Sequence, residues 1–231
     1  MIKTGEEIER LKKAVVVNEN ALKVAFGSLK DGNEIDNSRA AARKIAEGGA
    51  LPLSVGIRAS RKPNGKLGYR FKEGDVVWHD FLISYNGYCA DTSRMAAVGE
   101  PRNSAKRTCR LLANVAGSII EMARPGTRVS ELYEEAIRQL TEKSRYAHGK
   151  LGPCFGHGIG ICLGNCLGIC PHEEPWIVPG SDGVLKPGMV INLEFPLNYL
   201  GLGVFNVEDT ILITQRGNKR LSSLPRELHT A

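Results

Sequence analysis

Two short stretches, Gly74-Asp-Val-Val-Trp-His-Asp80 and Gly188-Met-Val-Ile-Asn-Leu-Glu194, share one pattern and decide the fold. In each, a glycine leads a short apolar strand, and an acidic residue follows six positions after that glycine. In each, a turn comes next and a second acid lies on the return strand, at Asp91 and at Glu208. A repeat of this size predicts a pseudo-symmetric α+β fold, in which two half-domains of antiparallel strands covered by helices face one another.

The register of the first hairpin follows from its turn. Asn86-Gly87 is a strong two-residue turn signal, so the residue numbers of each cross-strand pair should add to 173, and Asp91 should lie opposite Leu82. Asp80 is two residues from Leu82 and therefore lies on the same sheet face as Asp91. His79 then points to the opposite face, where we expect it to be packed or to cap a neighbouring segment.

The second hairpin gives the same result from a different loop. The numbers of Glu194 and Glu208 centre its turn on Gly201, so an odd-length loop places both glutamates on one face. The sequence thus predicts that four carboxylates converge between the half-domains.

Helical periodicity predicts four helices outside these two hairpins. Thr4 followed by Glu7 is a capping-box pattern, and the helix that it opens should end at Gly27. Further helices are predicted over residues 36–47, 104–123 and 130–144, with Pro125-Gly126 separating the last two. From Gly48-Gly49 to Gly74 the sequence favours an irregular, basic, solvated stretch.

Composition sets the broad class. The chain has 231 residues, 42% hydrophobic residues and a formal net charge of +6, which is typical of a globular protein with a sizeable core. No apolar window approaches the roughly 20 residues of a membrane span, and no motif that reads nucleic acid is present. Six cysteines are too few for a disulfide scaffold. The sequence therefore favours a cytoplasmic protein with reduced thiols, and neither nucleic acid nor a membrane as partner.

Four converging carboxylates require a compensating charge. Like charges a few ångströms apart in a partly dry site force protonation or recruit a metal. Glycines flank His157 in Gly156-His-Gly-Ile-Gly160 and allow a close approach of the backbone, which makes this histidine a candidate fifth ligand. Mixed carboxylate and imidazole ligands suit manganese, cobalt, iron or zinc better than calcium. Two such ions sharing bridging acids can activate a water and polarise a carbonyl, as amide hydrolysis near neutral pH requires.

Five blocks occur in a fixed order along the chain. They are residues 73–94, the 156–160 motif, His172-Glu-Glu-Pro175, residues 185–194, and Val207-Glu-Asp-Thr210. In this order the chain resembles the pita-bread metallopeptidases (family M24), which include methionine aminopeptidase, Xaa-Pro dipeptidase, Xaa-Pro aminopeptidase and creatinase. The resemblance covers essentially the whole chain, and the short return from Glu194 to Glu208 is most similar to the Xaa-Pro dipeptidases.

The resemblance implies a metal centre and a mechanism. The implied ligands of two divalent ions, manganese or cobalt with iron and zinc as alternatives, are Asp80, Asp91, His157, Glu194 and Glu208. Asp91 and Glu208 would bridge both ions, Glu194 would also relay the proton of the metal-bound water, and His172 would bind the substrate or the tetrahedral intermediate. The implied activity is cleavage of Xaa-Pro bonds in small peptides by a hydroxide bound to both metals.

Three departures from the family pattern keep other functions open. Residues 62–64 contain no histidine where many family peptidases have one, and Asn206 stands where many prolidase-like members have an arginine. Residues 161–170, with Cys162, Cys166 and Cys170, lengthen the passage to His172 by about eight residues relative to the family. Alternatives are therefore a same-fold enzyme for a small non-peptide substrate, and a binding module without catalysis.

The resemblance also predicts the domain organisation. Residues 1–231 should form a single pita-bread catalytic domain without the extra amino-terminal domain of prolidase-like enzymes. Such a chain can be a compact family member, a truncated gene product or a remnant. A homodimer stays open as its assembly.

Overall fold

The computed structural model describes residues 2–30, 32–60, 68–143, 155–159, 172–199 and 203–230. Its elements, in chain order, are α1 (Gly5–Gly27), α2 (Glu34–Glu47), β1 (Ala50–Ala59), β2 (Val76–Tyr85), β3 (Tyr88–Ala97), α3 (Asn103–Met122), α4 (Val129–Lys143), β4 (Gly156–Ile159), β5 (His172–Glu173), β6 (Val190–Glu194), β7 (Leu197–Tyr199), β8 (Gly203–Phe205), β9 (Glu208–Ile213), β10 (Asn218–Arg220) and β11 (His229–Thr230). None of the described helices is long and apolar enough to cross a bilayer.

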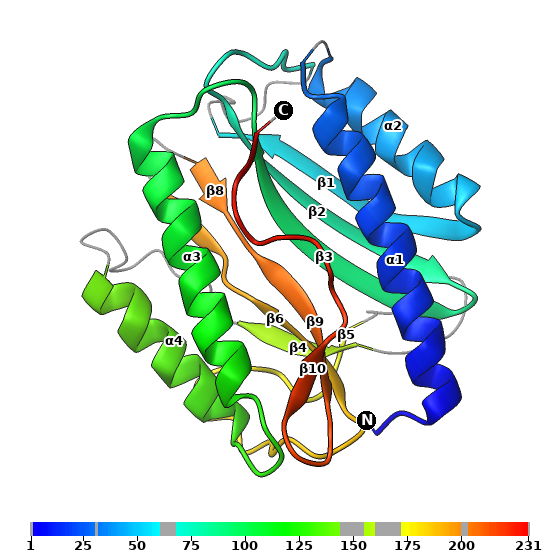
Figure 1. Ribbon diagram of the computed structural model, residues 1–231, viewed down its shortest axis with the longest axis vertical. Helices are drawn as coiled ribbons and strands as arrows, with labels where there is room; N and C mark the ends of the chain where they lie inside the picture. Colours follow the sequence, from blue (N-terminus) through cyan, green and yellow to red (C-terminus); the bar gives the residue numbers. More distant parts are fainter. Residues whose placement is uncertain are drawn as a thin grey trace.

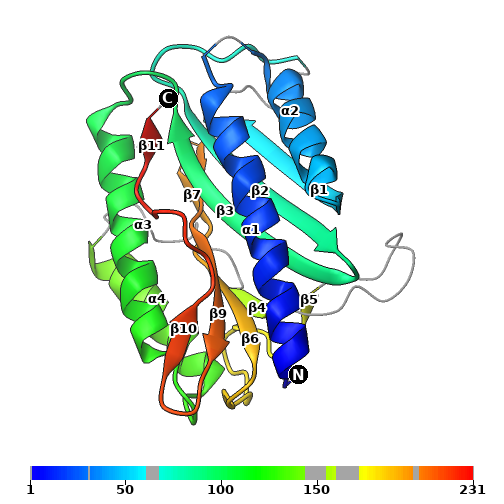
Figure 2. The ribbon, with the colours of Figure 1, turned by 45° about the vertical axis from the view of Figure 1, so that its right-hand side comes forward.

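Two sheets form the two halves of the fold. The first has the order β1-β2-β3-β11, and the second has the order β10-β9-β6-β4-β5. In Figure 1, α1 and α2 lie over the first sheet, whereas α3 and α4 lie beside the second. β3 packs against β9, so the sheets meet where each carries a predicted acid. The C-terminal strand β11 returns to the first sheet and pairs with β3, as Figure 2 shows.

The helix ends follow local capping chemistry. Thr4 and Glu7 form both bonds of a capping box, and α1 ends at Gly27 as predicted. α2 begins two residues before the predicted position because the Asn33 side chain accepts a hydrogen bond from the Asp36 amide and acts as its N-cap. The boundaries of α3 and α4 lie within one residue of the predicted ones.

The predicted irregular stretch after α2 is wrong over its first part. Residues Ala50–Ala59 form β1, which pairs antiparallel with β2 along its whole length. Apolar residues do alternate here, but Pro52 and Gly56 are both strand-breaking signals. The register shifts between Pro52 and Ser54, and such an irregularity in an edge strand tolerates a proline. Residues 61–67 of the basic stretch lie outside the described residues.

Each half has its own apolar core. Side chains such as Leu22, Ile45 and Phe81 fill the space between the first sheet and its two helices. Leu112 and Phe195 belong to the corresponding core of the second half. Burial of these side chains contributes roughly 1.5–3 kcal/mol each, and it holds the sheets in place at their junction.

A buried carboxylate ties the C-terminal segment to the first half. Glu19 on α1 accepts hydrogen bonds from the backbone amides of Ser223 and Leu224. These bonds satisfy a group that would otherwise be costly to bury. They fix the segment whose carbonyl groups support the site described below.

Candidate metal centre

Strand pairing brings the predicted acids onto facing positions. Leu82 pairs with Asp91 across β2 and β3, which confirms the predicted register and places Asp80 on the face of Asp91. Glu194 pairs directly with Glu208 across β6 and β9, so these two also share a face. The return through β7 and β8 keeps the same register, in agreement with a turn centred on residue 201.

Three of the acids meet at the junction of the sheets. Carboxylate oxygens of Asp80, Asp91 and Glu208 all lie within 4.8 Å of one another. Asp91 and Glu208 are buried, and Asp80 is partly buried. Asp80 and Asp91 come from the first sheet and Glu208 comes from the second, so the cluster exists only when both halves are folded together.

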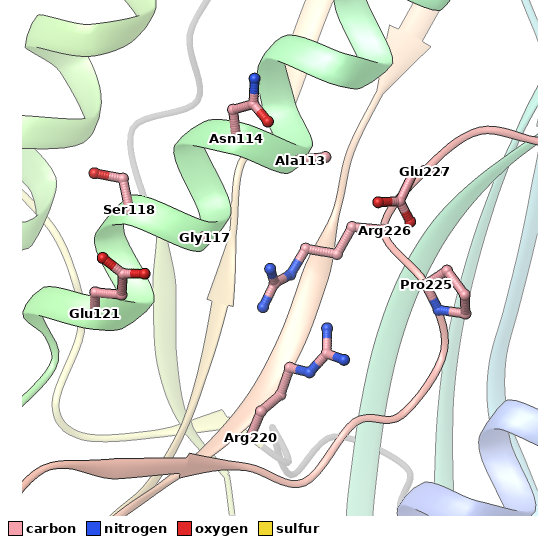
Figure 3. A pocket seen from close by; sticks show the side chains of 9 residues that line it. All are labelled: Ala113, Asn114, Gly117, Ser118, Glu121, Arg220, Pro225, Arg226 and Glu227. Atoms are coloured by element: carbon pink, nitrogen blue, oxygen red, sulfur yellow. The ribbon is translucent and has the colours of Figure 1, made fainter.

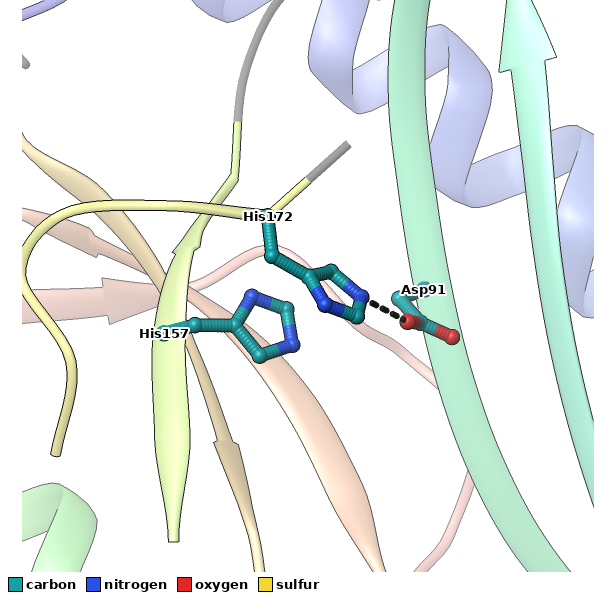
Figure 4. A group of neighbouring side chains, drawn as sticks. All are labelled: Asp91, His157 and His172. Atoms are coloured by element: carbon teal, nitrogen blue, oxygen red, sulfur yellow. Dashed lines mark hydrogen bonds and ion pairs between the residues drawn. The ribbon is translucent and has the colours of Figure 1, made fainter. Parts of the chain in front are cut away.

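A second group shares Asp91 with two histidines. Ligand atoms of Asp91, His157 and His172 also lie within 4.8 Å of one another. Figure 4 shows both imidazoles pointing toward Asp91, and His172 Nε2 lies 3.3 Å from Asp91 Oδ2. The predicted lengthening of the chain before His172 therefore does not keep this side chain away from the acids. Residues 161–170, including Cys162, Cys166 and Cys170, and residues 62–64 lie outside the described residues.

The orientation of His157 presents one nitrogen to the cluster. Its Nδ1 lies 3.0 Å from the Gly158 carbonyl oxygen, which can only accept, so Nδ1 carries the proton. Nε2 then has a free lone pair and lies 3.8 Å from Glu208 Oε1. A neutral imidazole with this tautomer is the form that binds metals. Gly156, at φ 148°, is required because a Cβ there would lie 2.1 Å from the Asn192 carbonyl oxygen.

Burial and like charge shift the titration of the acids. Desolvation, followed by the charges of Asp91 and Glu194, raises the pKa of both Asp80 and Glu208 well above the usual range. Burial, followed by the charge of Asp91, raises the pKa of Glu194 to about 7. Burial, followed by the neighbouring His172, lowers the pKa of His157 to about 4. The site thus favours protonated acids and a neutral imidazole unless a cation compensates the charge.

The donor set fits divalent cations. Oδ1 of Asp91 is buried and has no hydrogen-bond partner among the described residues, although buried carboxylate oxygens are normally satisfied. The oxygen donors are carboxylates and the nitrogen donors are imidazoles, a mixture suited to manganese, cobalt, iron or zinc. A cation at this position would satisfy the orphaned oxygen and remove the mutual repulsion of the acids.

Two asparagines that the sequence analysis did not assign to the site hold the glutamates in place. Asn192 donates through Nδ2 to Glu208 Oε1 at 2.8 Å and to the Asp91 carbonyl oxygen at 3.0 Å. Asn206 donates through Nδ2 to Glu194 Oε2 at 3.1 Å, and its Oδ1 accepts from the Phe195 amide. Asn192 lies two residues before Glu194 on the same strand face, so strand alternation was a signal that could have identified it.

A buried arginine supports the strand that carries Glu208. Arg94 is 1% exposed, pairs with the Asp209 carboxylate, and donates to the Glu208 carbonyl oxygen. Its remaining donors bind the carbonyl oxygens of Ser93, Leu224 and Pro225. Burial alone would raise the pKa of Asp209, but the arginines around it hold that pKa below the usual value. Apart from Ser93, these partners lie more than 100 residues from Arg94 in the chain, so no local pattern predicts them.

Solved structures with a similar fold include, by title, an X-Pro aminopeptidase and a prolidase. The X-Pro aminopeptidase from Thermotoga maritima MSB8 has a TM-score of 0.89 at 25% identity, covering 100% of this chain and 65% of that one. The prolidase from Pyrococcus horikoshii OT3 has a TM-score of 0.88 at 29% identity, covering 98% and 65%. These likenesses confirm the predicted α+β class and its pita-bread form.

Sequence comparison leads to the family. The model of metallopeptidase family M24 matches residues 9–215. The Xaa-Pro dipeptidase of Pyrococcus furiosus is 31% identical over 238 residues, which cover 99% of this chain. The chain belongs to metallopeptidase family M24. It spans 65% of the length of the Pyrococcus furiosus relative.

Proposed function

We propose that this protein is a metal-dependent peptidase that cleaves Xaa-Pro bonds of small peptides. The observation that carries the proposal is the meeting of Asp80, Asp91 and Glu208 within 4.8 Å, next to the neutral imidazole of His157. In the proposal, two divalent ions, manganese or cobalt, are held by Asp80, Asp91, His157, Glu194 and Glu208. When bound, such ions lower the pKa of a water and polarise the scissile carbonyl group.

Each ligand has a role that follows from its contacts. Asp91 belongs to both ligand groups, so it would help to hold both ions. The resemblance to family M24 implies the same part for Glu208. Glu194 has one oxygen bonded by Asn206, which leaves Oε1 to accept the proton of the attacking water.

His172 is the proposed substrate contact. Its side chain is 28% exposed, whereas that of His157 is 3% exposed, so His172 is the more accessible of the two rings. From this position it would donate a hydrogen bond to the oxygen that gains negative charge in the transition state.

The Xaa-Pro selectivity rests on the relatives and on one aromatic residue. Three of the similar proteins are named for Xaa-Pro or proline-containing substrates. Trp176 lies with its ring centre 5.9 Å from that of His157 and 6.0 Å from that of His172. An indole face beside the catalytic histidines provides an apolar surface against which a pyrrolidine ring would pack.

The test is hydrolysis by protein reconstituted with manganese or cobalt, against a chelated control. Substrates are Xaa-Pro dipeptides, longer Xaa-Pro peptides and Met-initiated peptides. We expect metal-dependent release of proline from the first class and two bound ions per chain. Asp91→Ala should lose metal and activity, whereas Asp182→Ala, at an exposed surface position, should retain both. Unchanged metal content and activity in Asp91→Ala would contradict the proposal.

A second candidate is an enzyme of the same fold that acts on a small non-peptide substrate. Asn206 favours it, because this side chain is engaged with Glu194 and Phe195 and supplies no cation for a peptide carboxylate. Two bound ions without cleavage of any peptide would favour this candidate. Failure to bind any metal would instead favour a binding module.

The compartment and assembly are part of the same proposal. We expect a cytoplasmic protein and leave a homodimer open.

A further inference from the structure

A cavity of about 580 Å³ lies outside the metal centre. It is bounded by α3 on one side and by β10 and the segment after it on the other, as Figure 3 shows. Arg220 and Arg226 project into it from that second side, and Gly117 and Ser118 line the α3 side. We call this cavity the arginine pocket.

The pocket has more positive charge than its internal partner can balance. Arg226 Nε donates to Asp209 Oδ2, and Arg220 Nη1 lies 3.7 Å from the same oxygen. The other carboxylate oxygen of Asp209 is taken by Arg94. One carboxylate therefore serves three guanidinium groups. Among the described residues, both Nη atoms of Arg226 and the Nε and Nη2 atoms of Arg220 have no hydrogen-bond partner.

These donors are neither fully exposed nor satisfied. The side chains of Arg220 and Arg226 are 32% and 20% exposed, so part of their hydration is lost. Glu121 and Glu227 also line the pocket, but both are exposed and neither pairs with an arginine among the described residues. The charge inside the pocket is thus available to a ligand.

The residue that faces the guanidinium group of Arg226 is a glycine. A Cβ at Gly117 would lie 3.5 Å from Arg226 Nη1, which is ordinary contact distance, so an alanine would fit. Glycine in a helix interior is less favourable than alanine. Its presence in the middle of α3 leaves the space in front of the guanidinium group open.

We propose that the arginine pocket binds a small phosphate-bearing molecule, with Arg220 and Arg226 holding the phosphate group. Guanidinium groups offer paired donors that match phosphate oxygens. In Figure 3 the two groups approach the same space from different positions on the chain. A tetrahedral phosphate can present oxygens to both, whereas a planar carboxylate has only two oxygens in one plane. The volume exceeds that of phosphate alone and leaves room for an organic part of the ligand.

The pocket is linked to the metal centre by a short chain of contacts. Asp209 receives Arg226 from the pocket and Arg94 from the core, and Arg94 donates to the carbonyl oxygen of Glu208. Occupancy of the pocket would draw on the same arginine that balances Asp209. A ligand bound in the arginine pocket is therefore connected to the metal centre through Asp209 and Arg94, although it does not enter the metal centre.

The experiment measures binding of inorganic phosphate by calorimetry with a chelator present, so that a metal centre cannot take the anion. We expect one site per chain in the wild type. Arg220→Gln should weaken binding at least about tenfold, since one charge-assisted hydrogen bond is lost. Gly117→Leu should abolish binding by occupying the space in front of the Arg226 guanidinium group. Gly117→Ala and Arg216→Gln, an exposed arginine outside the pocket, should bind within about twofold of the wild type.

Several outcomes would overturn the proposal. They are no binding by the chelated wild type, equal binding by Arg220→Gln, and equal binding of acetate at matched ionic strength. If Gly117→Leu does not fold, as judged by circular dichroism, Arg220→Gln still decides the matter. Among the described residues, the 3.7 Å contact with Asp209 is the only ion pair of the Arg220 side chain. Adenosine monophosphate and glycerol phosphate then distinguish a nucleotide from a simpler phosphate ester. Because the chelator is always present, failure of the proposed peptidase activity leaves this result unaffected.

Discussion

Replacement of Asp91 by asparagine should stabilise the metal-free protein while it removes metal binding. Asp91 is the one acid that belongs to both ligand groups, and its charge contributes to the raised pKa values of Asp80, Glu194 and Glu208. Asparagine keeps the size of the side chain and an oxygen that can accept from His172. Its amide group can donate to a neighbouring carboxylate, which aspartate cannot do.

The magnitude follows from the geometry and the titration. Two unit charges 4.8 Å apart repel by about 3–4 kcal/mol at an effective dielectric constant of 20. The site avoids this cost by holding protons. For Glu194, the rise from 4.5 to about 7 corresponds to roughly 3 kcal/mol, with burial as the larger cause and Asp91 as the second. We therefore expect Asp91→Asn to raise the free energy of unfolding by about 1–2 kcal/mol at pH 8. For a chain of this size, that is a rise in Tm of about 4 °C.

The assay is thermal and denaturant unfolding with a chelator, at pH 8 and at pH 6. The gain should shrink at pH 6, where the neighbouring acids are protonated in the folded protein. Added manganese should raise the Tm of the wild type but not that of the variant. If Asp91→Asn destabilises the chelated protein at pH 8, or gains as much from manganese as the wild type, the repulsion described here does not exist.

Further predictions concern the supports of the site and its response to pH. The chelated wild type should lose stability as pH rises from about 5 to 7.5. The pKa of Glu194 is raised from 4.5 to about 7, so the folded state binds more protons than the unfolded state in this window. Denaturant titrations at several pH values measure this slope, and a rise in stability would contradict it. Arg94→Met should lower the free energy of unfolding by about 3–5 kcal/mol, because it leaves Asp209 buried with one of its charge partners removed. Urea unfolding measures this free energy, and a loss below about 1 kcal/mol would refute the supporting role of Arg94. Asn206→Ala should lower the free energy of unfolding by about 1–2 kcal/mol and reduce kcat about tenfold, because Glu194 loses its hydrogen bond. The metal content should not change. Metal analysis beside steady-state kinetics separates this result from simple loss of metal.

Local sequence chemistry was sufficient to predict the parts of the site that lie on hairpins. The Asn86-Gly87 turn fixes which residue faces Asp91, and the structure has that register. Glu194 and Glu208 were expected to share a face if an odd-length loop joins their strands, and the two residues pair directly. Alternation along a strand then decides which side chains share a face. No long-range information is needed for these steps.

The missed parts depend on tertiary context. β1 lies within the stretch that was predicted to be irregular. It contains Pro52 and Gly56, which both disfavour a strand, and its pairing with β2 compensates for them. The partners of Arg94 come from a strand and a segment far along the chain. His79, in contrast, was correctly predicted to face away from the acids. It is buried against Phe26 and Asn37, and burial lowers its pKa to about 3.

The contacts of Arg94 oppose the mutual repulsion of the carboxylates, and this explains how the fold tolerates the acids. Four carboxylates at the junction of two sheets push the halves apart unless they are protonated or bound to cations. Arg94 acts in the other direction, since it joins β3 of the first sheet to Asp209 and to the Glu208 backbone of the second. Asp209, which Arg94 binds, directly follows Glu208, one of the mutually repelling acids, on β9. Arg94 can therefore hold the two halves together when no cation compensates the charge of the acids.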